Sequence, residues 1–250
     1  MSDVHGRADA LARAADDADV LVCLGDLVLF LDYQDSSGGI FASLFGAENA
    51  ERLVALRTAR RFDEARTFSR GLWGSLDRDP KTVIEEAVRA QYAELFAAMP
   101  TPAYLPYGNV DVPAMWPEFL RPGHTVLDGE TAEIGGRTWG FVGGGLRTPQ
   151  GTPYEVDDDV YAAKVAALGS VDVLACHIPP DVPELLYDVE ARRFERGSAA
   201  VLEAVRETQP ELVLFGHVHQ PLRSRIRIGR TECVNVGHFR GTGVPYSLEY

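Results

Sequence analysis

The sequence predicts a layered α/β domain with mixed β-sheets and one long helical insertion. Short apolar runs recur along the chain and end in glycine or polar residues, which is typical of buried strands. Helical patterns separate several of these runs, and two runs near the C-terminus flank a Gly-Arg pair, as the strands of a β-hairpin would. Strands that alternate with helices and then close with hairpins are typical of sheets covered by helices.

The elements follow one another in a regular order. Apolar runs predict strands at residues 20–24, 103–107, 138–142, 171–176 and 212–215. Helical periodicity predicts helices at residues 8–18, 83–98, 160–168 and 199–208. The hairpin is expected at residues 223–228 and 231–236, and a short apolar stretch, residues 246–250, closes the chain.

Residues 28–100 depart from this rhythm. They are mostly helical in pattern and carry no strand signal, although they stand between two predicted strands. Loops beyond strand ends accept insertions most easily, so the segment is expected to form a helical cap within a single domain, residues 1–250.

Composition limits the functional classes. The fractions of hydrophobic residues, 46%, and charged residues, 24%, are ordinary for a globular protein, and no apolar run is long enough to cross a bilayer. The first ten residues do not have the pattern of a signal peptide, and Cys23, Cys176 and Cys233 lie singly in apolar runs. We therefore expect a cytoplasmic protein with buried, reduced cysteines and no membrane partner.

The charge of the chain argues against nucleic acid as a partner. The 37 acidic and 24 basic residues give a net charge of −13, which repels a phosphate backbone over most of the surface. Nearly all of the basic residues are arginine and alanine is abundant, which indicates a GC-rich bacterial genome.

Metal-binding residue types stand at the ends of five strand-like segments. These residues are Asp3 and His5, then Asp26, then Asn109, then His177, and finally His217 and His219. Residues beyond the carboxyl ends of the strands of an α/β sheet converge on one crevice, and residues two apart on an extended segment share a face. We therefore expect these seven side chains to form one site.

The donor set identifies the class of ion. Two carboxylates, one amide and four imidazoles suit Mn²⁺, Fe or Zn²⁺ better than Mg²⁺ or Ca²⁺. Seven ligands are too many for one transition metal that keeps an open position, so two divalent ions are implied, with Mn²⁺ preferred. Paired metals about 3.5–4 Å apart are used for in-line attack at phosphorus.

The motifs SDVHG, LGDL, YGNVD, CHIP and FGHVH occur in this order along nearly the whole chain. Together they resemble the calcineurin-like metallophosphoesterase superfamily. The resemblance implies a sandwich of two mixed sheets flanked by helices, and a dinuclear-metal-dependent phosphoesterase in which a metal-bridging hydroxide attacks phosphorus.

The resemblance also implies roles for individual residues. One ion would be held by Asp3, His5, Asp26 and His219. The other would be held by Asp26, Asn109, His177 and His217. Asp26 would bridge the two ions, and Asp26, Asn109 and His177 are expected to be the catalytic residues.

Val110 is a departure from the family pattern, because many members carry histidine after the asparagine to assist the leaving group. Loss of a general acid would affect poor leaving groups most, by about 10²–10⁴-fold. Compact bacterial members with another residue at this position, which the sequence GNVD resembles, are often phosphodiesterases. The resemblance therefore favours a phosphodiesterase acting on a small or medium-sized ester, and a phosphomonoesterase or nucleotide phosphatase is the alternative. Asp111 is expected to orient the Asn109 loop.

Weaker signals surround the motifs. His238 could contact phosphate or replace the missing acid, or it could be a surface histidine, while His124 has no companion. Tyr33 could line the substrate site or belong to the core of the insertion.

An arginine-rich stretch could bind a substrate phosphate or form a solvated helical face; it comprises Arg52, Arg57, Arg60, Arg61, Arg66 and Arg70. Gly143, Gly144 and Gly145 lack the spacing of a nucleotide-binding loop and are expected to form a tight loop beside the site.

Two other functional classes remain as alternatives. A metal-free scaffold of the same fold would be expected to lose ligand residues, yet all seven are present. A nuclease would be expected to carry a basic surface.

The beginning of the chain is a further expectation. Asp3 should close a buried strand, but only two residues precede it, and a strand typically needs about five or six. The native protein is therefore expected to begin about five to ten residues earlier, with a short first strand as the alternative.

Overall fold

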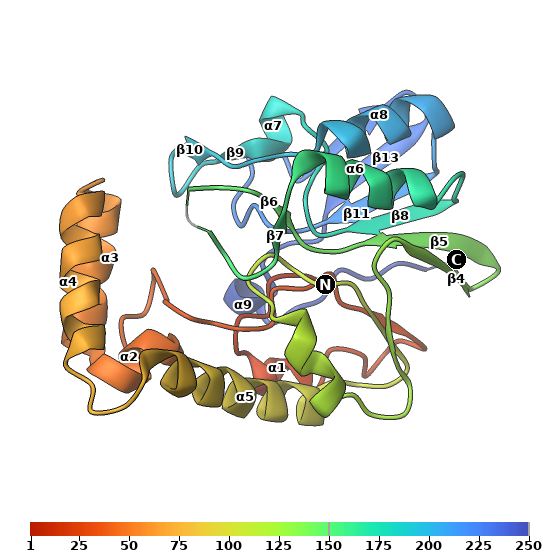
Figure 1. Ribbon diagram of the computed structural model, residues 1–250. Coiled ribbons are helices and arrows are strands. Elements are labelled where there is room, and N and C mark those ends of the chain that lie inside the picture. Colours follow the sequence, from red (N-terminus) through yellow and green to blue (C-terminus); the bar gives the residue numbers. More distant parts are fainter. Residues whose placement is uncertain (150, 250) are drawn as a thin grey trace. The chain divides into compact units, whose positions relative to one another are not determined.

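The computed structural model describes residues 1–149 and 151–249. The chain divides into two compact units (Figure 1). One unit combines Met1–Leu27 with Leu95–Tyr250, and the other comprises Val28–Glu94. The strands of the described residues all belong to the first unit, and the second unit is helical.

A six-stranded mixed sheet forms the centre of the first unit, in the order β12-β13-β11-β8-β5-β4. The four inner strands run parallel to one another, and the two edge strands pair antiparallel to their neighbours. The bounds are β4 Glu130–Ile134, β5 Arg137–Val142, β8 Val173–Cys176, β11 Leu212–Phe215, β12 Arg225–Ile228 and β13 Thr231–Asn235.

Strands β8 and β11 of this sheet are apolar at every position, and both of their faces are covered. In β11, Leu212 and Leu214 face one core cluster, whereas Val213 and Phe215 face another. The second cluster contains residues of helices α6 (Asp158–Ala167) and α8 (Ala199–Thr208), which lie on the same face of the sheet (Figure 1). A continuous apolar run is the pattern expected for such a strand.

Helix α6 packs closely on the sheet where the sequence has glycine. A Cβ atom at Gly140 in β5 would lie 2.8 Å from a methyl carbon of Leu168, immediately after the helix. Glycine at this position therefore permits the close approach of the helix end to the strand.

A smaller sheet lies on the other side of the first core cluster. Its strands β1 (Leu21–Val22), β2 (Ala103–Leu105) and β3 (His124–Val126) are all parallel. Its side chains Val22 and Tyr104 pack against Trp139 and Phe141 of the larger sheet. The expected α/β fold with two packed sheets and flanking helices is therefore confirmed, with the mixed pairing in the larger sheet.

The first residues of the chain run beside this smaller sheet. The amide of Leu24 donates to the carbonyl of Met1, and the amide of Asp3 donates to the carbonyl of Gly25. The terminal ammonium of Met1 donates to the carbonyl of Val22 at 2.9 Å. These bonds bring Asp3 to the end of β1.

Short elements complete the first unit. They are α1 Ala8–Leu11, the 3₁₀-helix η1 Pro113–Glu118, β6 Gly145–Leu146, β7 Glu155–Val156, α7 Pro183–Leu186, β9 Tyr187–Asp188, β10 Arg193–Phe194 and α9 Phe239–Thr242.

The second unit has its own aromatic core. Phe41 is fully buried, and the rings of Phe45 and Trp73 meet edge to face at 4.6 Å. Its helices are α2 Gly39–Phe45, α3 Ala47–Thr58 and α4 Phe62–Gly74. Helix α5 spans Pro80–Ala98, and its residues up to Glu94 belong to this unit. The segment is helical, as expected; that it caps the site stays a prediction.

The elements predicted from the sequence are present in the structure, except near the two ends of the chain. The structure also contains short or polar strands that no apolar run predicts. The five strands and the hairpin are present, but the predicted helix over residues 8–18 ends at Leu11 and continues as turns, so its second half was wrong. Residues 246–249 form no strand, and residue 250 lies outside the described residues. The three cysteines are buried and free, as expected. Every helix in the described part of the chain is too short or too polar to cross a membrane.

Candidate metal centre

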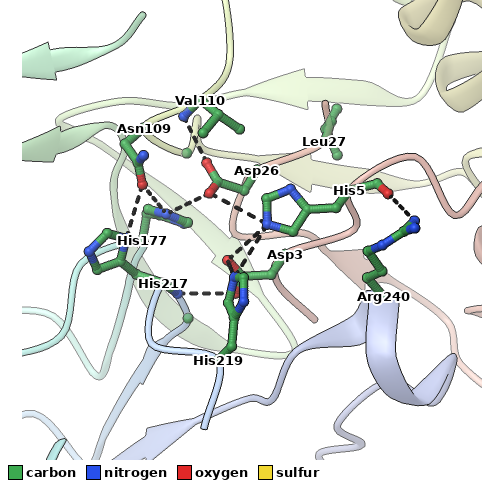
Figure 2. Close-up of polar contacts among 12 residues, drawn as sticks. Asp3, His5, Asp26, Leu27, Asn109, Val110, His177, His217, His219 and Arg240 are labelled. Atoms are coloured by element: carbon green, nitrogen blue, oxygen red, sulfur yellow. Dashed lines mark hydrogen bonds and ion pairs between the residues drawn. The ribbon is translucent and has the colours of Figure 1, made fainter. Parts of the chain in front are cut away.

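The seven side chains expected at the site converge in the first unit (Figure 2). Asp26 follows β1, Asn109 follows β2, His177 directly follows β8, and the Gly216–His219 loop follows β11. These strands present their carboxyl ends to the same side of the fold, where ligand sites of α/β proteins form.

Four of these residues have strained backbones. Asp3, His5, Asp26 and His217 have φ angles of 59°, 41°, 56° and 68°, in the left-handed region that non-glycine residues seldom adopt. Such a conformation costs about 1–3 kcal/mol and persists only where the surroundings enforce it. The left-handed backbone conformation directs the side chains of these loops toward one point. Strained residues of this kind cluster at functional sites.

Two glycines allow the loops to come together. A Cβ atom at Gly108 would lie 2.0 Å from Oδ1 of Asp26, and one at Gly216 would lie 1.9 Å from Oγ of Ser2. A larger residue at either position would push apart the strand-end loops that carry the site.

The His5 cluster, defined as Asp3, His5, His219 and His238, forms one half of the site. The Nε2 atoms of His5 and His219 are 3.4 Å apart, and Nε2 of His219 is 3.5 Å from Oδ1 of Asp3. The rings of His219 and His238 stack with centroids 3.8 Å apart and planes 3° from parallel. This half is partly open, because the side chain of His219 is 39% exposed.

The Asn109 cluster, defined as Asn109, His177 and His217, forms the other half. Oδ1 of Asn109 lies 3.0 Å from Nε2 of His177 and 3.0 Å from Nδ1 of His217. His177 is fully buried. The amide oxygen and two imidazole nitrogens therefore face a common point.

Asp26 lies between the two clusters. Its Oδ2 is 3.5 Å from Nε2 of His177 and 3.9 Å from Nε2 of His5, and its Oδ1 accepts a hydrogen bond from the amide of Val110 at 2.9 Å (Figure 2). One carboxylate oxygen thus faces both halves while the backbone holds the other.

A layer of hydrogen bonds fixes the Asn109 cluster. Nδ1 of His177 donates to the carbonyl of Leu24 at 2.9 Å, which leaves Nε2 directed at the site. Nδ2 of Asn109 donates to Oγ1 of Thr152 at 3.1 Å, and Thr152 donates to Glu155 at 2.8 Å. Such partners orient metal-ligating side chains and set their tautomer.

Asp111 lies between two of the loops that carry the site. Its buried carboxylate accepts the backbone N–H groups of Asp26 at 2.9 Å, Leu27 at 3.0 Å and Gly108 at 2.8 Å. These bonds tie the Asp26 loop to the Asn109 loop.

The segment after β13 supports the His5 cluster. Nδ2 of Asn235 donates to the carbonyl of Val218 at 2.9 Å, and the amide of Arg240 donates to the carbonyl of Asp3 at 3.0 Å. The guanidinium of Arg240 also donates to the carbonyl of His5 at 2.8 Å (Figure 2). The C-terminal segment therefore holds the first and last ligand loops together.

The carboxylates of the site are anionic. Burial would raise the pKa of Asp3, but His219 and the other nearby histidines outweigh it and hold this pKa well below its usual value. The same opposition of burial and histidines, led by His177, lowers the pKa of Asp26. Burial and the charge of Asp26 raise the pKa of Asp111 to about 6.

The histidines divide into charged and neutral groups. Burial opposes charge on His177, but the negative Asp26 outweighs it and raises the pKa to about 9. Burial and the charge of His177 lower the pKa of His217 to about 4. Burial, and next the charge of His219, lower the pKa of His238 to about 3. The raised pKa of His177 shows that a positive charge is favoured beside Asp26.

The donor geometry fits divalent metal ions. Ligand atoms of Asp3, Asp26 and His177 lie within 4.8 Å of one another, and so do those of His5, His219 and His238. Oδ1 of Asp3 is buried and has no hydrogen-bond partner within the described residues. An unpartnered buried carboxylate oxygen is costly unless a cation completes its contacts.

The weaker sequence signals lie in different surroundings. The Gly143–Gly145 loop is beside Asn109, as expected, because a Cβ atom at Gly145 would lie 2.5 Å from Cβ of Asn109. Tyr33 belongs to the helical unit, where it is 54% exposed and its hydroxyl accepts a hydrogen bond from Arg57 at 3.1 Å.

The arginine-rich stretch also belongs to the helical unit. Arg61 pairs with Glu64, and Arg66 lies 3.7 Å from Asp63, on exposed side chains. The guanidinium of Arg52 lies over the ring of Phe68, 4.6 Å from its centre. These contacts match the solvated helical face.

The sequence did not identify several supporting groups. Thr152, Glu155, Asn235 and the Leu24 carbonyl are fixed by contacts between distant segments, and no local motif marks them. Only the short separation between Thr152 and the glycine loop beside Asn109 could have drawn attention to one of them.

The chain is similar to a known family and to solved structures. Residues 1–221 match the family model described as calcineurin-like phosphoesterase. One crystal structure is 18% identical with a TM-score of 0.58, over 96% of this chain and 89% of the other. The crystal structure of TT1561 of Thermus thermophilus is 16% identical with a TM-score of 0.53, over 96% of this chain and 88% of that one. These likenesses show the fold alone. No curated protein matches the chain significantly.

Proposed function

Because the chain belongs to the calcineurin-like phosphoesterase family, we propose that it hydrolyses small phosphodiesters with two divalent metal ions. The family implies metal-dependent hydrolysis of phosphoesters. The observation that carries the finer proposal is the position of Asp26, whose Oδ2 lies 3.5 Å from His177 and 3.9 Å from His5. One carboxylate oxygen between two groups of N and O donors is suited to bridge two ions.

The proposed ligands divide between the two halves of the site. One ion is held by Asp3, His5, Asp26 and His219. The other is held by Asp26, Asn109, His177 and His217. The N and O donors favour Mn²⁺, with Fe or Zn²⁺ as the other suitable ions.

The ions, when bound, supply a water-derived nucleophile of lowered pKa and neutralise charge on the phosphoryl oxygens. Asp26 would contribute a carboxylate to both ions, because its Oδ2 faces both halves of the site. The Asn109 amide and the His177 imidazole hold their donor atoms in place through Thr152 and the Leu24 carbonyl. Loading requires His177 to release its proton, so metal affinity falls as the pH falls.

The preference for diesters is supported by Val110. This residue binds Asp26 through its backbone amide and offers no acidic proton at the position where many relatives carry histidine. Compact members of the family that this sequence resembles at GNVD are often phosphodiesterases, and substrates with an aryloxide leaving group depend least on a general acid. Phosphomonoester hydrolysis is the alternative outcome, and a non-catalytic scaffold is the second.

The test uses the protein reconstituted with Mn²⁺, Fe²⁺ or Zn²⁺. Turnover of a bis-aryl phosphodiester is compared with that of the corresponding mono-aryl ester, and bound metal is counted by elemental analysis. We expect two ions per chain and faster diester turnover. Faster monoester turnover would refute the diester assignment. One ion per chain would refute the dinuclear centre, and two ions without hydrolysis of either ester would support the scaffold.

A further inference from the structure

His238 belongs to the site, although it lies beyond residues 1–221, the part of the chain that matches the family. It follows β13 and is joined to Ser2 by a parallel β-bridge. Its side chain stacks on His219, and its ring centre is 5.8 Å from that of His5. Only 7% of the residue is exposed. The imidazole is therefore built into the His5 cluster.

One ring nitrogen of His238 is not hydrogen-bonded within the part of the chain that the structure describes. This atom, Nε2, is buried. Leaving a buried polar atom unsatisfied is costly, so a group that completes the contact is expected to bind there. One ring nitrogen from each of His5, His219 and His238 lies within 4.8 Å of the other two, which puts the imidazole of His238 at the candidate metal centre.

The stacked geometry keeps the rings of His219 and His238 from directing lone pairs at the same point. An imidazole binds a metal through a lone pair in the plane of its ring. The planes of His219 and His238 are 3° from parallel and the ring centres are 3.8 Å apart. His5 and His219 would therefore hold an ion without a lone pair from His238, and the ring of His238 would be free to contact another group.

We propose that the imidazole of His238 donates a hydrogen bond to a phosphoryl oxygen of the bound substrate. This inference rests on the proposed function. A phosphoryl group bound by the ions presents acceptor oxygens at the edge of the centre, and the ring of His238 offers an N–H donor held by stacking. The contact adds a donor from the C-terminal segment, which is separate from the loop that carries Val110.

The experiment separates the hydrogen bond from the stacking. His238→Phe keeps a flat ring and removes both nitrogens, whereas His238→Gln carries an amide N–H at about the reach of Nε2. The control is His124→Phe, because His124 also has a buried, unpartnered Nε2 but packs against Phe96. Binding of inorganic phosphate to each Mn²⁺-loaded protein is measured by calorimetry, together with metal content and diester kinetics.

We expect His238→Phe to bind the same number of ions as the wild type and phosphate about tenfold more weakly, the effect of losing one hydrogen bond to a charged group. KM for the diester should rise by a similar factor. His238→Gln should stay within about threefold of the wild type, since most of the hydrogen bond remains, and His124→Phe should be unchanged.

Two results would overturn the proposal: undiminished phosphate affinity in His238→Phe, or a loss of bound metal in both His238 variants. Its failure is distinguishable from that of the proposed function. A wild type that hydrolyses no ester but loses phosphate affinity on His238→Phe refutes only the proposed function. A wild type that hydrolyses diesters, with phosphate affinity unchanged in the variant, refutes only the role of His238.

Discussion

The two halves of the site differ in how much of their geometry the protein fixes by itself. In the Asn109 cluster, His177 is fully buried, Nδ1 of His177 is bonded to a carbonyl, and the Asn109 amide is bonded on both sides. In the His5 cluster, His219 is 39% exposed, and Oδ1 of Asp3 and Nε2 of His238 have no hydrogen-bond partner within the described residues.

The difference shows how a site can be both rigid and open. Hydrogen bonds from distant segments preorganise the Asn109 cluster, so it needs little adjustment when a ligand arrives. The His5 cluster keeps unsatisfied atoms, and these are the atoms that bound groups can complete. Asp26 and the loop joined to it by Asp111 connect the two halves.

The largest effect is expected from the residue that both halves share. Asp26→Asn should reduce hydrolysis by about 10³-fold or more, because the substitution removes a charge aligned with the reacting centre. Bound metal should fall from two ions toward one or none by elemental analysis. Asp172→Asn is the control, since Asp172 is an exposed carboxylate bonded to Thr138. Two bound ions and near-normal turnover in Asp26→Asn would contradict the bridging role.

The next effect concerns the rigid half. Val110→His adds an imidazole beside Asp26, and we expect the ratio of monoester to diester turnover to rise by about 10²-fold, the lower end of general acid effects. Val110→Leu keeps the backbone contact without the imidazole and should leave the ratio unchanged. If the ratio is the same in both variants, Val110 does not determine substrate choice.

A smaller effect should follow from loosening the Asn109 amide. Thr152→Val removes the acceptor of Nδ2, and affinity for one of the two ions should fall by about tenfold, as is usual for groups that orient ligands. Metal titration measures both affinities. Thr152→Ser should restore the wild-type value.

Thr148→Val is the matched control for this variant. Thr148 donates to the same oxygen of Glu155 at 2.7 Å, whereas the acceptor of Nδ2 of Asn109 is Thr152. Equal losses in Thr148→Val and Thr152→Val would mean that the loop as a whole matters, and that the bond to Asn109 does not.

The smallest effect is a local one. Removal of metal by a chelator should increase backbone hydrogen exchange in the His5 cluster, at residues 3–6 and 217–219, more than at residues 108–111. The reason is that only the first group depends on bound ions to satisfy buried atoms. Exchange measured by mass spectrometry with and without Mn²⁺ checks this expectation. Equal increases in both regions would remove the distinction between the halves.

Much of the fold follows from local patterns. The runs at β8 and β11 are apolar at every position, and the structure covers both of their faces. Strand β4 was missed because its sequence ETAEI is polar and its exposed edge position requires no apolar run. Helix α1 ends early although the alanine-rich sequence continues, because propensity is a weak determinant of helix length without tertiary packing.

The sequence by itself determined which donors the site contains and their order on the strands, because a strand end and its next residues are local features. The tertiary structure decided which donor atoms meet. The bond from His177 to Leu24 spans 153 residues and the bond from Asn109 to Thr152 spans 43, and neither is encoded in a motif. It also decided that His238, an isolated histidine in the sequence, stacks on His219. The physical reason is that sheet order brings distant strand ends together, and only packed coordinates specify the distances and ring planes on which ligand chemistry depends.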